Sequence, residues 1–135
     1  MSVVLAFDFG LSHTGVAVGQ SITQTATGVC TLRGTNGKFK LRDLQGVLEA
    51  HKPDELLVGL PLNMDDSESD MTAYAQKFAQ RLRNLSGLEV HMHDERLSSV
   101  AAEEQLADAR ALGRAQTDHE LAACIILEGW FLQST

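Results

Sequence analysis

Cysteine is scarce in this chain of 135 residues, which contains only two. Cys30 and Cys124 lie far apart, show no Cys-x-x-Cys spacing, and have apolar neighbours in the sequence. The sequence therefore gives no sign of a disulfide framework or of a redox motif. Free cysteines behave as small apolar residues, so we predict that both are buried, reduced thiols.

Positive charge is also scarce, since 11 Lys and Arg residues face 18 Asp and Glu residues and the net charge is −7. A protein that coats nucleic acid without specificity normally has a basic excess that neutralises phosphates. The composition argues against that class. It leaves open an enzyme that meets nucleic acid through a local patch and bound divalent cations.

Long apolar runs are absent, because no segment approaches the ~18 apolar residues that a membrane-spanning helix needs. The N-terminus also lacks a basic region followed by a long apolar stretch, as a secretory signal would have. We therefore expect a cytoplasmic protein with no membrane partner. The length suits one domain over residues 1–135, large enough to bury a single core.

The most informative pattern lies near the N-terminus. Residues 3–7 form an unbroken apolar run, which predicts a central strand covered on both faces, and Asp8 interrupts that run. Gly10 and Gly15 flank a short polar turn that leads into a second apolar strand. A buried carboxylate is costly unless it is paired. Asp8 therefore either caps the turn or binds a metal or phosphate at the strand end.

The rest of the chain alternates between helical and strand patterns. We expect a third strand over 25–32, then a helix over 39–51, a strand over 56–60, a helix over 68–85, a strand over 88–92, and helices over 97–112 and 117–132. A three-strand antiparallel meander followed by alternating elements predicts an α/β protein. Its five-stranded mixed sheet would add two parallel strands to the meander and carry helices on both faces.

His91 and His93 fall on one face of the expected last strand. A metal pair is one interpretation of this spacing. Alternating polar residues on an edge strand usually face solvent, and we favour that interpretation.

Three acids from distant parts of the chain each end or open an expected core element. Asp8 ends the first strand, Glu95 follows the last strand beside Asp94, and Asp118 opens the terminal helix. Mg²⁺ and Mn²⁺ prefer such carboxylate ligands. Two of these ions ~4 Å apart can promote phosphodiester hydrolysis. The alternatives are that Asp118 complements the helix dipole and that Glu95 pairs with Arg96.

Four blocks of the sequence resemble the YqgF, or RuvX, family, a RuvC-related branch of the ribonuclease H-like nucleases. The blocks keep the family's order and are LAFDFG at 5–10 with GVAV at 15–18, VGLPLNMD at 58–65, DERLSSV at 94–100, and Asp118 leading into LAACIIL at 121–127. The resemblance covers nearly the whole chain.

This resemblance implies a ribonuclease H-like fold and a metal-dependent endonuclease that acts on structured nucleic acid. By the same resemblance Asp8, Glu95 and Asp118 match the positions thought to hold Mg²⁺ or Mn²⁺, as a two-ion site, with Asp94 in reserve. The substrate contacts expected from the matching segments are Arg96, Asn63, His13 and Arg114.

Family members are assigned to maturation of the 5′ end of pre-16S ribosomal RNA, and an earlier proposal made them Holliday junction resolvases. Both stay open, with branched DNA as the alternative substrate. A catalytically silent ribosome-assembly module and a relative of the sugar kinases remain as rivals. A monomer or weak dimer is expected, and a ribosomal particle is a candidate partner.

The chain departs from the family at two places that normally carry cations. The first turn reads Leu11-Ser12-His13, without the usual basic residue, and the loop before Asp118 keeps Arg114 alone. Each lost cation lowers the attraction for phosphate. The chemistry is therefore better supported by the sequence than the binding of substrate.

Overall fold

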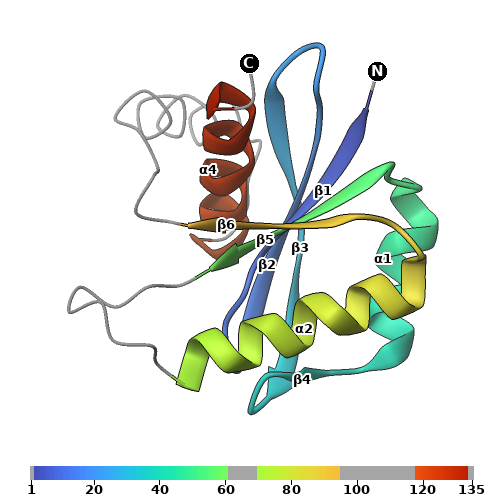
Figure 1. Cartoon of the computed structure of the whole chain (residues 1–135), viewed down its shortest axis with the longest axis vertical. Helices are drawn as coiled ribbons and strands as arrows, with labels where there is room; N and C mark the ends of the chain where they lie inside the picture. The colour runs from blue at the N-terminus through green and yellow to red at the C-terminus, as the bar shows by residue number, and fades with distance from the viewer. Residues whose placement is uncertain (1, 61–69, 95–117, 134–135) are drawn as a thin grey trace.

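A computed structural model of the chain describes residues 2–60, 70–94 and 118–133. Its centre is a six-stranded mixed sheet with the strand order β4-β3-β2-β1-β5-β6 (Figure 1). The strands are β1 (Val3–Asp8), β2 (His13–Gln20), β3 (Thr25–Thr35), β4 (Lys38–Phe39), β5 (Glu55–Leu60) and β6 (Val90–Asp94). The described helices are α1 (Leu41–His51), α2 (Asp70–Ser86) and α4 (Asp118–Gln133). The helix expected over 97–112 lies outside the described residues.

The predicted mixed sheet is confirmed. β1, β2 and β3 form an antiparallel meander, and β5 and β6 add to β1 in parallel. Strand β1 therefore lies inside the sheet, with a neighbour on each side. This position explains the unbroken apolar run that precedes Asp8.

The prediction of five strands is wrong by one, because β4 forms a short sixth strand against the end of β3. Asn36 and Gly37 connect the two strands, with φ of 52° and 79°. Positive φ at both central residues is typical of a tight Asn-Gly hairpin turn. Phe39 is therefore the last residue of β4 and does not open the next helix. Helix α1 begins at Leu41.

Helices cover both faces of the sheet, as predicted. On one face Leu5, Phe7 and Val58 pack in a core that includes Leu44 of α1 and Phe78 of α2. On the other face Val4, Ala6 and Leu57 pack against α4. Figure 1 shows α4 on its own side of the sheet, away from α1 and α2.

Two glycines of β2 let α4 lie close to the sheet. A Cβ atom added to Gly15 would collide with the backbone carbonyl of His119 at the start of α4. A Cβ added to Gly19 would press against the side chains of Leu127 and Phe131. Only glycine permits this approach of backbone to backbone.

Both cysteines are free, in agreement with the prediction of reduced thiols. Cys124 is fully buried in α4, but Cys30 of β3 is only partly buried, so the prediction of burial was right for one. Cys30 lies in the stretch of β3 that precedes its pairing with β4. In the described part of the chain, no helix is long and apolar enough to cross a membrane.

Candidate active site

Asp8 is the last residue of β1, at the C-terminal end of that strand. The sheet register places Gly15 of β2 beside it on one side and Gly59 of β5 on the other. Residues paired across a sheet point to the same face, and alternation along β1 puts Asp8 on the face of Val4 and Ala6, which α4 covers. The partly buried Asp8 is thus flanked by two positions that have no side chain.

The beginning of α4 lies against the same end of the sheet. The helix starts at Asp118, and the carbonyl of His119 rests where a Cβ of Gly15 would lie. Since Gly15 is the register partner of Asp8, the structure brings the backbone of Asp118 into the neighbourhood of Asp8. These two predicted metal positions, far apart in the chain, therefore meet at one edge of the sheet.

The third predicted ligand, Glu95, lies outside the described residues, but the strand before it is described. β6 ends at Asp94, which pairs with Leu60 at the end of β5. Both strands run parallel to β1, so their C-terminal ends lie at the same end of the sheet as Asp8. Three of the predicted substrate contacts also fall outside the described residues, namely Asn63, Arg96 and Arg114.

His93 of β6 is buried, with 4% of its surface exposed, so the prediction that it faces solvent is wrong. It pairs with Gly59, which in turn pairs with Asp8, and the three residues form one row across the sheet. On the same face of this edge strand, the ring of Trp130 in α4 lies 5.1 Å from that of His91. The alternation of residues along the strand did not show that His93 would be buried.

His13, a predicted substrate contact, opens β2 and is exposed. Its ring stacks on that of His119, with centroids 5.0 Å apart and planes within 6°. The Oγ of Ser12 lies 3.1 Å from its Nδ1. The two rings connect the β1–β2 turn to the start of α4, at the edge of the sheet where Asp8 lies.

Two acids of α4 that the sequence did not single out are buried in the structure. Glu120 and Glu128 are 6% and 2% exposed. The Oε1 of Glu128 accepts a hydrogen bond of 3.2 Å from the backbone N–H of Ala26, so this carboxylate joins α4 to β3. Their only signal in the sequence is that two acids interrupt a strongly apolar helix.

A different group of possible metal ligands occurs at the opposite edge of the sheet. Side-chain atoms of Glu55, Glu89 and His91 all lie within 4.8 Å of one another. The Nε2 of His91 is 3.2 Å from the Oε1 of Glu55, which makes a half-exposed ion pair when the histidine is protonated. Glu55 opens β5, so this group is not the predicted site.

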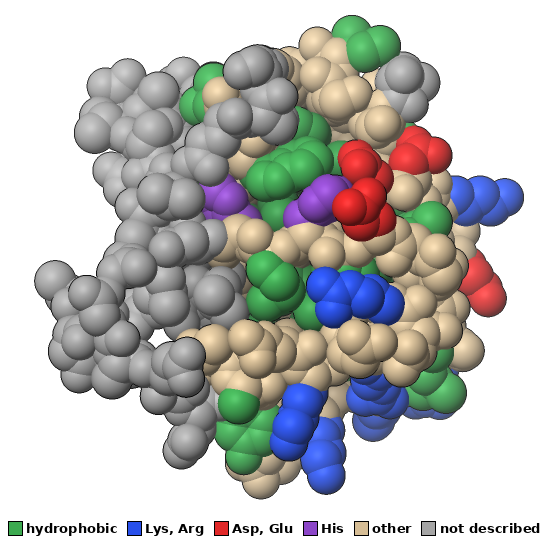
Figure 2. Space-filling model, in the orientation of Figure 1, with side chains coloured by type: hydrophobic (Ala, Val, Ile, Leu, Met, Phe, Trp, Pro, Cys, Tyr) green, Lys and Arg blue, Asp and Glu red, His purple; other side chains and the backbone are tan. Residues whose placement is uncertain are grey.

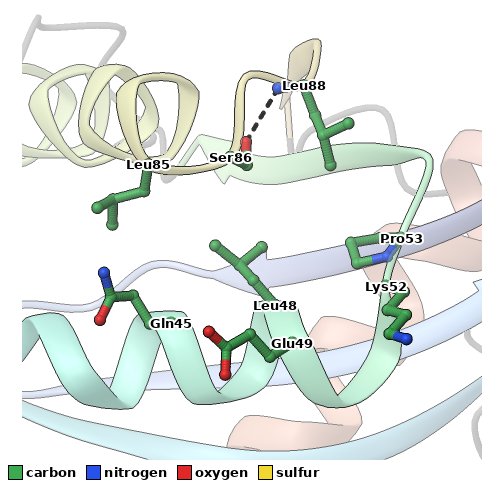
Figure 3. Close-up of a pocket in the computed structure, with 8 residues that line it drawn as sticks. All are labelled: Gln45, Leu48, Glu49, Lys52, Pro53, Leu85, Ser86 and Leu88. Carbon is green, nitrogen blue, oxygen red and sulfur yellow. Dashed lines mark hydrogen bonds between the residues drawn. The ribbon is translucent and has the colours of Figure 1, made fainter.

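A hollow of about 430 Å³ also lies away from Asp8 (Figure 3). Leu48 of α1 and Leu85 at the end of α2 face it, and Pro53 closes it shortly before β5 begins. It therefore lies near the N-terminal ends of the parallel strands, on the α1 and α2 face. Its lining includes no histidine or cysteine, and Glu49 is its one acid. This hollow therefore lacks the set of acidic ligands predicted around Asp8.

The chain matches a protein-family model over nearly its whole length. The family model described as "RuvX: Holliday junction resolvase" matches residues 2–133. Two relatives from Escherichia coli, of strains K12/DH10B and O9:H4 (HS), carry the name "Putative pre-16S rRNA nuclease". Each is 45% identical over 133 residues, which is 96% of this chain and 96% of the relative.

Solved structures of resolvases share the fold. Thermus thermophilus RuvC in complex with a Holliday junction substrate superposes with a TM-score of 0.70 at 17% identity, over 99% of this chain and 96% of that one. The yeast mitochondrial resolvase Ydc2 gives 0.58 at 9% identity, over 95% and 78%. The fowlpox virus resolvase gives 0.54 at 13% identity, over 98% and 99%. The ribonuclease H-like fold is thereby confirmed.

Proposed function

Because this chain belongs to the RuvX family of nucleases, we propose that it cuts pre-16S ribosomal RNA as a metal-dependent endonuclease during ribosome maturation. The single observation that carries the proposal is the placement of Asp8. Its strand end lies between Gly15 and Gly59, and the helix that begins at Asp118 packs on Gly15.

The residues at this edge suit hard divalent cations. Asp8, Asp118 and Glu95 would hold Mg²⁺ or Mn²⁺ through carboxylate oxygens, which these ions prefer. When bound, such ions supply Lewis-acid stabilisation of the charge that develops during phosphodiester hydrolysis.

The chain's own contribution is to fix these groups in place. Asp8 is held by the ladders to β2 and β5, so its backbone cannot shift without breaking the middle of the sheet. The exposed rings of His13 and His119 stand at the same edge, within reach of a substrate that approaches from solvent. We assign them to substrate contact together with Asn63, Arg96 and Arg114.

A second candidate function is resolution of four-way DNA junctions. It is favoured by the printed description of the family and by the fold shared with RuvC. Junction resolution requires two active sites that cut opposing strands, so it predicts a dimer. Processing of an RNA end is compatible with a monomer or weak dimer, bound to a ribosomal particle in the cytoplasm.

One assay separates these functions. Purified protein is incubated with Mn²⁺ and either a 5′-extended 16S precursor fragment or a synthetic four-way junction, with EDTA as the metal-free control. Cleavage of the RNA alone supports the proposal, and paired cuts in the junction by a dimer overturn it in favour of the resolvase. Binding of the RNA without any metal-dependent cleavage overturns the nuclease function and leaves an assembly factor.

A further inference from the structure

Residues 33–42, RGTNGKFKLR, hold four cations and no acid in a chain of net charge −7. This basic hairpin consists of the end of β3, β4 and the start of α1. Its cations are all exposed, and the described part of the chain provides no ion pair for them. They are Arg33, Lys38, Lys40 and Arg42.

The basic hairpin is fixed to the edge of the sheet where Asp8 lies. The backbone N–H groups of Gly34 and Gly37 donate hydrogen bonds of 2.9 and 2.8 Å to the carbonyls of Ser12 and Leu11 in the β1–β2 turn. Arg33 is the register partner of His13, the residue that stacks on His119. The cations therefore begin directly beside the candidate active site.

Helix α2 adds two cations to this surface. The guanidinium of Arg81 donates a hydrogen bond of 2.8 Å to the carbonyl of Phe39 in β4. Lys77 lies one turn earlier on the same helix and is exposed. In Figure 2 several Lys and Arg side chains gather over the lower edge of the molecule, around α2 and β4.

A hollow of about 640 Å³ continues from the basic hairpin between β3 and α1. Arg33, Lys40 and Arg42 line its near end, and His51 lies at the far end of α1. Asp43 is its one acid. A concave surface lined by several cations raises the local concentration of a polyanion.

Two of these cations lie at the N-terminus of α1, where Asp43 is the one acid of the first turn. Lys40 is the N-cap residue of α1, and Arg42 lies in the first turn. The N-terminus of a helix carries partial positive charge, so cations there are destabilising and an anion is stabilising. A phosphate group beside this turn would relieve the repulsion.

We propose that the basic hairpin, with the hollow beside it, binds the phosphate backbone of the nucleic-acid substrate next to the end of the sheet where Asp8 lies. The inference rests on the proposed nuclease function and adds the surface that binds the substrate. It accounts for a chain that has no cation in its first turn and only Arg114 in the loop before Asp118, because residues 33–42 add further phosphate contacts. The occupant is a nucleic-acid backbone, since four exposed cations without an acid among them complement a row of phosphates and the family acts on nucleic acid.

The test removes charge without removing length. Lys38→Gln, Lys40→Gln and Arg42→Gln are combined in one protein, and Lys52→Gln serves as the matched control. Lys52 is exposed and ends α1 at the opposite edge of the sheet. Binding of the 5′-extended 16S fragment and of the junction is measured without divalent metal over about 50 to 200 mM salt, where phosphate contacts dominate the salt dependence.

Loss of three phosphate contacts should weaken binding at low salt by at least tenfold. It should reduce the slope of log K against log[salt] by roughly 2 to 3, because each contact contributes about 0.7 to 0.9. Lys52→Gln should bind as the wild type does. Circular dichroism and thermal unfolding establish that all variants are folded.

A triple variant with the wild-type affinity and slope overturns the inference, whereas metal-dependent cleavage by the same preparation would leave the nuclease function standing. Conversely, binding that depends on the basic hairpin in a protein that never cleaves supports the inference and overturns the nuclease function. A wild-type protein that binds neither probe overturns both.

Discussion

The imidazole rings of His13 and His119 lie face to face, 5.0 Å apart and within 6° of parallel. One ring belongs to the first residue of β2, directly after the β1–β2 turn, and the other to the first turn of α4. The contact therefore joins the two segments that frame the candidate active site. It is made by exposed residues, so it is open to direct test.

A double-mutant cycle of His13→Ala and His119→Ala should give a coupling free energy. Stacked aromatic pairs are worth about 0.5 to 1.5 kcal/mol beyond their buried area. We expect a value at the lower end, because both rings are exposed. Chemical unfolding of the four proteins measures it, and additive effects of the two substitutions would show that the stack does not hold α4 in place.

Gly15→Ala should destabilise the protein by about 1 to 3 kcal/mol, the usual effect of overpacking. The new Cβ would collide with the carbonyl of His119, so α4 must move away from the sheet. Cleavage should fall as well, because Asp118 moves with the helix. Thermal unfolding and the cleavage assay measure the two effects.

Gly46→Ala is the matched control for that variant. Gly46 lies inside α1, with no atom within 4 Å of the position of a Cβ. Alanine should stabilise the protein by about 0.5 to 1 kcal/mol, since glycine is a poor helix former. A Gly15→Ala protein as stable as Gly46→Ala would contradict the close approach of α4.

Asp8→Asn should lower the rate of cleavage on the order of a hundredfold or more, because a metal ligand supplies several kcal/mol of transition-state stabilisation. Folding should be retained, since asparagine has the same shape. The rate is measured in Mn²⁺ under single-turnover conditions. Wild-type cleavage by this variant would remove Asp8 from the active site.

Asp54→Asn controls for the loss of one acid near β1. The Oδ2 of Asp54 accepts a hydrogen bond of 2.8 Å from the N–H of Val3, at the end of β1 opposite to Asp8. This variant should lose up to about 1 kcal/mol of stability, the usual net value of one hydrogen bond, and keep its rate.

The Cys30 thiol should react slowly with iodoacetamide in the folded protein. Burial raises the pKa of this thiol, and the nearby carboxylates of Glu120 and Asp43 raise it further. Less thiolate is then present at pH 8 than in an unfolded chain, whose cysteines have a pKa of about 8.5. Mass spectrometry of the labelled Cys30 peptide measures the rate, and labelling as fast as in urea would contradict the raised pKa.

The same shift makes stability depend on pH. The raised pKa in the folded protein means that Cys30 contributes stability below about pH 8.5 and loses it as pH rises further. A Cys30→Ser protein, which has no thiol to titrate, should therefore lose stability less steeply between pH 8 and 10. Urea unfolding across that range measures the difference.

The sequence predicted the features that follow from local pattern. The apolar run before Asp8 indicated a central strand, and the apolar terminal helix with an acid at its start indicated α4. The burial of His93 could not be predicted, because it arises from tertiary packing that the local pattern of β6 does not contain. Alternation along a strand defines its two faces without showing which of them is covered.

The basic hairpin was missed for a related reason. Residues 33–37 contain glycine and asparagine and were interpreted as a connecting turn, while the cations on both sides were assigned to different elements. The Asn36-Gly37 turn folds these elements together, and the hydrogen bonds of Gly34 and Gly37 attach them to the β1–β2 turn. The cations of these elements form one surface only in the folded protein.

With Asp118 as a proposed metal ligand, the packing of α4 on Gly15 has a consequence for the timing of activity. The ribosome makes the strand that carries Asp8 first and the helix that begins at Asp118 last, and chains start to fold from the N-terminus as they emerge. Until α4 docks, the centre lacks Asp118, and the sheet face of Val4, Ala6 and Leu57 is bare. On this assignment, a nascent chain cannot cut its substrate until its last helix has been made and has docked on the sheet.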